Sequence, residues 1–266
     1  MTAKNLLPEN ISISQFKELL KQYPALIESI SATKGSKLGQ KSLAALDKFR
    51  YDEAISIFSS QTPKRAINHD DVKTLVEWKL RHGTFRPTLM KLVSSNDEKT
   101  VNDTIEKAMK TYWTKPDAAK ALDGISKLKG IGPATASLLL SVHDPTRVIF
   151  FSDEAFYWLC CGGKKSAIKY NAKEYQELNS SAEKLVKRLG VSATDVEKVA
   201  YVVVRQAGVS TNAKEGNSKG EEEEPAPAVK PLEEVSEKYV AKRKETARDE
   251  AEEARPVRRS KRGKPS

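Results

Sequence analysis

The sequence predicts an all-α fold, and three observations carry this prediction. Over residues 11–207, apolar residues recur three and four positions apart, which is the spacing of one face of a helix. Ser, Asp, Pro and Gly, the residues that start or end helices, separate these stripes. The β-rich runs at residues 148–151 and 201–204 are short and flanked by helix signals, so no strand pair is expected. We therefore expect a flexible N-terminus (1–10), a helical domain (11–207), and a disordered linker and basic tail (208–266).

In the first part of the domain, each expected helix has an apolar stripe and a recognisable boundary. Stripes run through residues 12–30, 43–58 and 71–82, and a short helix and a longer one at 101–113 follow. Proline interrupts a helix because it lacks the amide N–H, and glycine commonly ends one. The boundaries that follow are a start at Ser12 or Ser14, a break or restart at Pro24, an end at Pro63, a cap at Asp70 or Asp71, an end at Gly83 and a start at Pro87.

The turn at residues 77–87 combines cations with aromatic side chains. Trp78 and Phe85 lie close in sequence to Arg81 and Arg86, a combination that suits phosphate pairing and base stacking. The alternative is that the aromatic residues belong to the core and the cations to a solvated face. We favour the core for Trp78 and keep Arg81 and Arg86 as candidate DNA-binding residues.

Residues 117–142 are the stretch around which the domain is organised. A helix-competent run from Asp117 leads into the turn Gly-Ile-Gly-Pro at residues 130–133 and then into an apolar helix. Two glycines permit a sharp bend and leave no side chain between the bend and a partner. The second helix points its free N–H groups and the positive end of its dipole at that partner, which favours a phosphate. A plain helix–turn–helix corner is the alternative; a dinucleotide loop needs a preceding strand and a third glycine, and both are missing.

Three further helices are expected after this hairpin. Ser152 caps the first of them, an amphipathic run at residues 171–189 closes at Gly190, and Thr194 or Asp195 caps the last. The remaining residues with chemical potential have plainer explanations. These are a turn for Asp144, a helix end for His143, and packing for Cys160 and Cys161.

The distribution of charge separates the domain from the tail. The chain has 266 residues and a net charge of +10. Of its 46 Lys and Arg, 14 lie from residue 214 onward, and of its 36 Asp and Glu, 13 do, so residues 1–213 carry +9. This cationic domain favours a polyanionic partner such as DNA, because neutralised phosphates release counterions. Ordinary lysine-rich solubility is the alternative. No apolar run is long enough to span a bilayer, so we expect no membrane association.

The tail is predicted from its composition. Residues 212–230 are of low complexity and hold no core-forming residues. Residues 255–264 are strongly basic, and with the basic triplet at 242–244 they resemble a two-part nuclear import signal. The alternative is a basic arm that binds nucleic acid directly. We expect a monomeric nuclear protein whose partners are DNA, through its backbone phosphates, and the nuclear import machinery.

The motif Leu-x-Gly-Ile-Gly-x-x-Thr-Ala-Ser at residues 128–137, with Asp153 placed 23 residues after its first glycine, resembles the helix-hairpin-helix DNA glycosylase superfamily. This family excises damaged or mismatched bases. Its bifunctional members carry a catalytic lysine four residues after the first glycine. That position is Ala134 here, so the resemblance implies no Schiff-base lyase activity. Some members hold an iron–sulfur cluster in a four-cysteine loop, and this chain has only two cysteines, so we expect no cluster.

The resemblance also implies roles for individual residues. Asp153 is expected to be the catalytic carboxylate, and the hairpin is expected to bind DNA. In the family, hairpin carbonyls hold K⁺ or Na⁺ that bridges to a phosphate, which implies Ser126, Leu128 and Ile131 here; no other cofactor is expected. The expected DNA-binding residues are Lys127, Lys129, Gly130, Ile131, Gly132, Ala134, Arg81 and Arg86, with the backbone N–H groups of Gly130, Gly132 and Ala134 facing the phosphate.

The chemistry assigned to Asp153 has a structural alternative. Base excision passes through an oxocarbenium-like sugar, which a carboxylate stabilises while it orients the attacking water. Asp153 can instead be an acidic residue in the first turn of a helix that Ser152 caps. Three hypotheses follow: a monofunctional DNA glycosylase, a catalytically inactive DNA or chromatin binder that kept the scaffold, and a protein-interaction scaffold that never touches DNA.

Overall fold

The computed structural model describes residues 6–215, with side chains through residue 207. Every regular element within this range is helical, which confirms the predicted all-α class. Residues 216–266, which make up most of the predicted linker and tail (208–266), and residues 1–5 lie outside the described residues. The elements are α1 (Ile13–Lys34), α2 (Leu43–Lys48), the π-helical turn η2 (Phe49–Glu53), α3 (Ala54–Phe58), α4 (His69–His82), α5 (Leu89–Ser94), α6 (Glu98–Thr114), α7 (Ala118–Ile125), α8 (Pro133–His143), α9 (Asp153–Cys160), α10 (Ala172–Leu189) and α11 (Ala193–Glu215).

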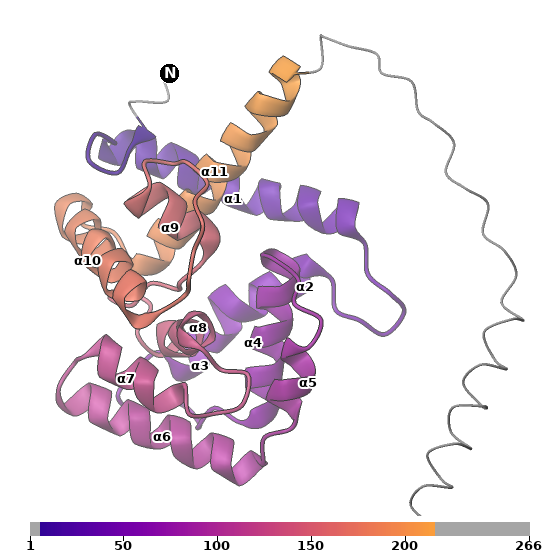
Figure 1. Cartoon of the computed structure of the whole chain (residues 1–266), viewed down its shortest axis with the longest axis vertical. Coiled ribbons are helices and arrows are strands. Elements are labelled where there is room, and N and C mark those ends of the chain that lie inside the picture. Colours follow the sequence, from indigo (N-terminus) through magenta and orange to yellow (C-terminus); the bar gives the residue numbers. More distant parts are fainter. Residues whose placement is uncertain (1–5, 216–266) are drawn as a thin grey trace, which may run out of the picture. The chain divides into compact units, whose positions relative to one another are not determined.

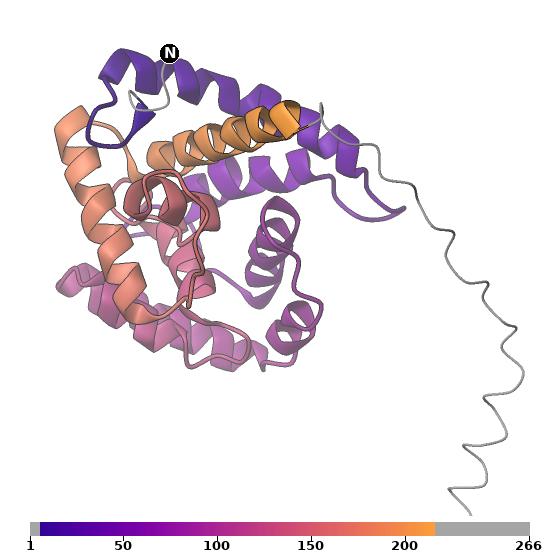
Figure 2. The same cartoon turned by 45° about the horizontal axis from the view of Figure 1, so that its top comes forward.

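The helices form two groups, which Figures 1 and 2 show from two directions. A terminal group contains α1, α9, α10 and α11; α1 packs along α11, and α9 packs against α10 and α11. A central group contains α2 to α8, with α7, α4 and α3 all packed against α8. All residues of α8 after its first proline are buried, so this helix is apolar on every side, as expected of a helix inside a core. No helix of the described part is long and apolar enough to cross a membrane.

Two helix starts differ from the sequence predictions, and for one physical reason. Asn68 caps α4, and Asp71 reaches back to the Asn68 N–H at 2.9 Å. Ser192 forms the same reciprocal pair with Asp195 at the start of α11. The acidic residues therefore occupy the third helical position, where a carboxylate satisfies the amide of the capping residue. The predicted caps at Asp70 or Asp71, and at Thr194 or Asp195, were wrong by two or three residues.

The prediction that Pro24 breaks or restarts the first helix was also wrong, because α1 continues through it. Pro24 lies on the exposed side of α1, so its ring meets solvent rather than the core, and the buried stripe continues through Tyr23 and Ile27. The last helix differs as well, since α11 continues to Glu215, past the predicted domain end at residue 207.

A buried ion pair joins the two groups of helices. Arg50, in η2, donates to the Glu197 carboxylate on α11 at 3.2 Å and to the Ser141 hydroxyl on α8 at 2.6 Å. Glu197 also accepts from the Tyr51 hydroxyl at 3.1 Å and from the backbone N–H of Phe150 at 2.7 Å. Both charged side chains are almost fully buried (0% and 2% exposed), so the pair fixes the position of the segment that precedes α9.

Candidate functional site

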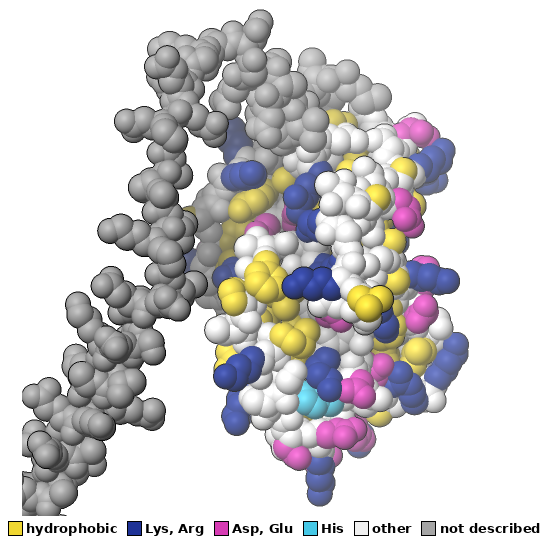
Figure 3. Space-filling model, turned by 90° about the vertical axis from the view of Figure 1, so that its right-hand side faces the viewer, with side chains coloured by type: hydrophobic (Ala, Val, Ile, Leu, Met, Phe, Trp, Pro, Cys, Tyr) yellow, Lys and Arg dark blue, Asp and Glu magenta, His cyan; other side chains and the backbone are white. Residues whose placement is uncertain are grey.

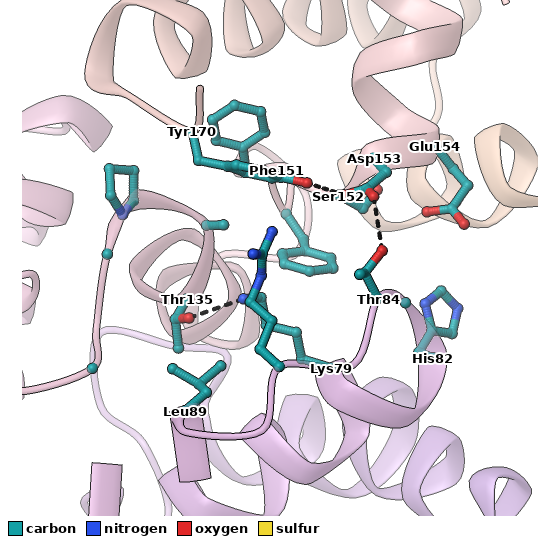
Figure 4. A pocket seen from close by; sticks show the side chains of 17 residues that line it. Lys79, His82, Thr84, Leu89, Thr135, Phe151, Ser152, Asp153, Glu154 and Tyr170 are labelled. Carbon is teal, nitrogen blue, oxygen red and sulfur yellow. Dashed lines mark hydrogen bonds between the residues drawn. The ribbon is translucent and has the colours of Figure 1, made fainter. Parts of the chain in front are cut away.

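A cavity of about 260 Å³ opens between the two groups of helices (Figure 4). Its walls come from the end of α4 and the following loop (79–89), from the hairpin and the start of α8 (130–135), from residues 150–154 at the start of α9, and from Tyr170. The predicted catalytic carboxylate and the predicted phosphate-binding glycines, which are far apart in sequence, therefore border one space.

Asp153 is the first residue of α9, and its side chain points toward the cavity (Figure 4). Ser152 caps this helix, as predicted, by accepting from the Ala155 N–H at 3.1 Å. Asp153 Oδ1 accepts from the Tyr170 hydroxyl at 2.5 Å, and Oδ2 accepts from the Thr84 hydroxyl at 3.2 Å. These two donors, from two separate loops, fix the orientation of the carboxylate at the cavity wall.

Tyr170 is held in an unusual backbone conformation. Its φ of 54° lies in the left-handed region, which costs a non-glycine residue about 1–3 kcal/mol. Its ring packs on Phe151 with 5.4 Å between centroids, and the Arg86 guanidinium lies 5.3 Å from its ring centroid. Burial and the hydrogen bond to Asp153 raise the pKa of Tyr170, so its hydroxyl remains a donor at neutral pH. This strained backbone places the Tyr170 hydroxyl, a hydrogen-bond donor, beside Asp153.

Lys79, on α4, brings an amine into the same cavity. Its side chain is half-buried, and its Nζ donates to the Thr135 hydroxyl at 3.2 Å (Figure 4). Burial, reinforced by the nearby Arg86 cation, lowers the pKa of Lys79 to about 8, and Asp153 opposes this shift. Lys79 is one of the cations of the turn at residues 77–87, and its inward direction depends on the packing of α4 against α8.

The neighbouring carboxylate, Glu154, is engaged elsewhere. It is buried and forms an ion pair with Arg205 on α11, at 2.9 Å. Burial raises the pKa of Glu154, while the Arg205 cation opposes that shift. Of the two adjacent acids, Asp153 is therefore the one oriented by neutral hydroxyls beside the cavity, and Glu154 joins α9 to α11.

The hairpin presents backbone donors at the cavity that Asp153 also borders. The N–H groups of Gly130, Gly132 and Ala134 make no hydrogen bond within the described residues, and all three residues line the cavity. These are the donors assigned to a phosphate from the sequence. The hairpin itself is closed by a bond from the Ile131 N–H to the Leu128 carbonyl at 3.1 Å. The carbonyls of Ser126, Leu128 and Ile131, predicted to hold a monovalent cation, belong to this same turn.

The two hairpin glycines serve different purposes. Gly130 has φ +76°, and a Cβ there would lie 2.9 Å from Leu92 Cβ and 3.2 Å from the Val93 side chain, so the fold itself requires glycine. Gly132 has φ −95°, and a Cβ there would meet nothing within 4 Å. The fold does not explain the absence of a side chain at Gly132, which leaves the surface above the start of α8 open.

Asn96 secures the hairpin, a role that no sequence pattern indicates. Its side-chain oxygen accepts from the Lys129 N–H at 2.8 Å, and its amide nitrogen donates to the Lys129 carbonyl at 2.9 Å. Lys127 and Lys129, both predicted DNA-binding residues, have exposed side chains on either side of Leu128.

A basic groove continues from the cavity across the surface, and Gly83 lines both. Figure 3 shows the face on which loop 35–42, α2 and α5 lie, where Lys and Arg side chains surround apolar ones. Phe85, between the cavity residues Thr84 and Arg86, is 68% exposed, whereas Trp78 is fully buried, which confirms the core assignment for Trp78. The cations that line the groove are Lys34, Lys37, Lys41, Lys73 and Arg81, and they outnumber its two acids, Asp70 and Glu77.

The two predicted DNA-binding arginines have different positions. Arg86 is exposed and lines the cavity beside Tyr170. Arg81 lies outside the cavity lining, and its guanidinium donates to the backbone carbonyls of Gly35 and Lys41. Arg81 therefore fastens the loop between α1 and α2 to α4, and its contribution to the groove is a charge at its wall.

Comparison of the chain with models of known protein families, with curated proteins and with solved structures gives no match. The function is therefore inferred from the geometry described above and from the resemblance of the hairpin motif.

Proposed function

We propose that this protein is a DNA glycosylase with a helix-hairpin-helix fold, which hydrolyses the N-glycosidic bond of a nucleotide turned out of the duplex. The observation that carries the proposal is the common cavity: the Asp153 carboxylate and the unbonded amides of Gly130, Gly132 and Ala134 border it together. A volume of about 260 Å³ lies just below the usual range of small-molecule pockets, roughly 300–1,000 Å³, and suits a single base.

The proposed chemistry needs one carboxylate. As the base departs, positive charge develops on the sugar, and Asp153 stabilises it and orients a water for attack. Opposite unit charges about 4 Å apart at an effective dielectric near 20 attract by about 4 kcal/mol. If this attraction exists only in the transition state, it accelerates the reaction about a thousandfold. The base must leave the stack first, because its sugar carbon is otherwise inaccessible.

The hairpin supplies the grip on the backbone in this proposal. A phosphate would accept from the free amides at the start of α8, where the helix dipole also favours an anion. Lys127, Lys129 and Arg86 add cationic charge nearby, and the hairpin carbonyls would hold K⁺ or Na⁺. We also propose that the protein is a monomer and that its basic tail directs it to the nucleus. Residues 216–266 of this tail lie outside the described residues.

The experiment is a base-excision assay on duplexes that each carry one damaged or mismatched base. Alkali then cleaves the strand wherever a base has been removed. We expect the wild-type chain to produce strand breaks on at least one duplex, Asp153→Asn to reduce the rate about a thousandfold, and the exposed control Asp103→Asn on α6 to match the wild type. Salt-sensitive duplex binding without excision of any base would instead identify a DNA binder that kept the scaffold.

A further inference from the structure

Among the basic residues of the described region, Lys79 combines features that make it reactive. Its amine faces a cavity, and none of the ion pairs within residues 6–215 includes it. Asp153, an acid of the same cavity, has both oxygens engaged by the hydroxyls of Thr84 and Tyr170. The hydrogen-bond partner of Lys79 is a neutral hydroxyl, that of Thr135.

This environment makes a substantial part of the amine neutral. A lysine with a pKa of about 8 is about one-quarter unprotonated at pH 7.5, whereas an ordinary lysine is unprotonated about once in a thousand. Desolvation and a neighbouring cation are the two means by which proteins convert lysine into a nucleophile for carbonyl carbons. Here the cavity supplies the first and Arg86 the second.

The position of the amine bears on the expectation from Ala134. Thr135, the hydrogen-bond partner of Lys79, directly follows Ala134 at the start of α8. The Lys79 amine, carried by α4, therefore reaches the start of α8, next to the position where the family has a catalytic lysine and this chain has Ala134. The sequence expectation considered only the hairpin, and the packing of α4 against α8 adds a lysine that it did not include.

We infer that Lys79 is the amine nucleophile of a second activity of this cavity, the cleavage of DNA strands at abasic sugars. The inference rests on the proposed function, because its substrate is the product of base excision. The reacting group is the aldehyde at C1′ of the ring-opened deoxyribose.

The reaction balances without an added oxidant or reductant. The Lys79 Nζ lone pair forms a bond to C1′; the two amine protons leave with the aldehyde oxygen as water, and the imine takes up one proton to become an iminium ion. Loss of a proton from C2′ then expels the 3′ oxygen, which breaks the strand. Asp153, the cavity carboxylate outside the ion pairs of the described residues, receives that proton. Water finally hydrolyses the iminium and returns the amine.

The test uses the full chain, a duplex with a preformed abasic site, and borohydride, which reduces an iminium to a stable covalent adduct. Digestion and mass spectrometry then locate the adduct. We expect a protein–DNA adduct on Lys79, at least tenfold less adduct with Lys79→Arg, and an unchanged yield with Lys184→Arg, a matched change at an exposed lysine of α10. Abasic-duplex binding by each variant is measured alongside, since Lys79→Arg retains the positive charge.

Three results would overturn the inference: an adduct on another amine, an undiminished yield with Lys79→Arg, or no adduct although the abasic duplex is bound. Because the abasic site is made beforehand, the test does not depend on base excision. An adduct on Lys79 without excision of any base therefore supports this inference and contradicts the glycosylase proposal. Base excision without an adduct supports the glycosylase proposal and contradicts the inference on Lys79. Failure to bind the abasic duplex contradicts both proposals.

Discussion

Replacing Gly132 by serine should strengthen the fold slightly and weaken DNA binding. Gly132 caps α8 without a side-chain hydrogen bond, its backbone angles suit any residue, and a Cβ there meets nothing within 4 Å. A serine at this position can accept from a first-turn amide, which is worth a few tenths of a kcal/mol relative to glycine. The same hydroxyl occupies the space and the donor that we assign to a phosphate. A hydrogen bond to a charged group contributes about 1.5–3 kcal/mol, so duplex binding should weaken about 10- to 150-fold.

Two measurements on the same protein test this prediction. Urea denaturation should give an unfolding free energy equal to or slightly above that of the wild type, and fluorescence anisotropy with a labelled duplex should give the loss of affinity. Gly132→Ala serves as the internal control, because alanine is a poorer helix cap than glycine and its methyl group also covers the amides. Both variants should therefore bind the duplex more weakly than the wild type, although the free energy of unfolding rises slightly in one and falls in the other. Full affinity in both well-folded variants would refute the assignment of this surface to a DNA phosphate.

Three further predictions concern Gly130, Glu197 and Lys79. Gly130→Ala should lower the free energy of unfolding by roughly 2–4 kcal/mol in urea denaturation, because it combines a left-handed backbone with a 2.9 Å approach to Leu92; wild-type stability would contradict the hairpin geometry. Glu197→Gln leaves the Arg50 cation buried without its counter-ion, which costs about 3–5 kcal/mol and should lower the Tm by roughly 6–20 °C in calorimetry; a smaller change means that water reaches Arg50. The folded-state pKa of Lys79 lies below its ordinary value of 10.5, so the wild type carries a destabilising charge below about pH 8 and loses that penalty between pH 8 and 10.5. Lys79→Met should therefore have a higher Tm than the wild type at pH 7, and this difference in Tm should shrink between pH 8 and 10.5. A difference that stays constant over this range would mean that the amine is solvated.

Much of the fold could be predicted from the sequence because the helices mark their own boundaries. The caps at Ser12 and Ser152, the closure of α10 at Gly190 and the all-α class follow from local signals. The helix starts at Asn68 and Ser192 were missed because an acidic residue can be either the cap or the third helical residue that pairs with the cap. Other features depend on tertiary packing. The helix tolerates Pro24 because this residue is exposed and leaves the buried stripe intact, and the buried Arg50–Glu197 pair joins segments whose proximity no local pattern indicates.

The candidate site could be predicted only in part. The hairpin and Asp153 carry a recognisable spacing, and in the structure they border one cavity. Thr84 and Tyr170 carry no such signal, because each acts through a loop that reaches Asp153 only after α9 is packed. Lys79 was visible as a cation, yet its nucleophilic character depends on burial, which is a property of the assembled helices rather than of the turn in which it lies.

The central claim, that one nucleotide is held by the hairpin and presented to Asp153, is tested most directly by a crystal structure of the chain bound to a duplex that contains a stable abasic-sugar analogue. We predict the anomeric carbon of the analogue within about 4 Å of the Asp153 carboxylate, the separation assumed for the charge stabilisation. We also predict a neighbouring phosphate within hydrogen-bond distance of the Gly132 and Ala134 amides. An analogue that remains stacked in the duplex, or a phosphate bound away from the start of α8, would contradict the account.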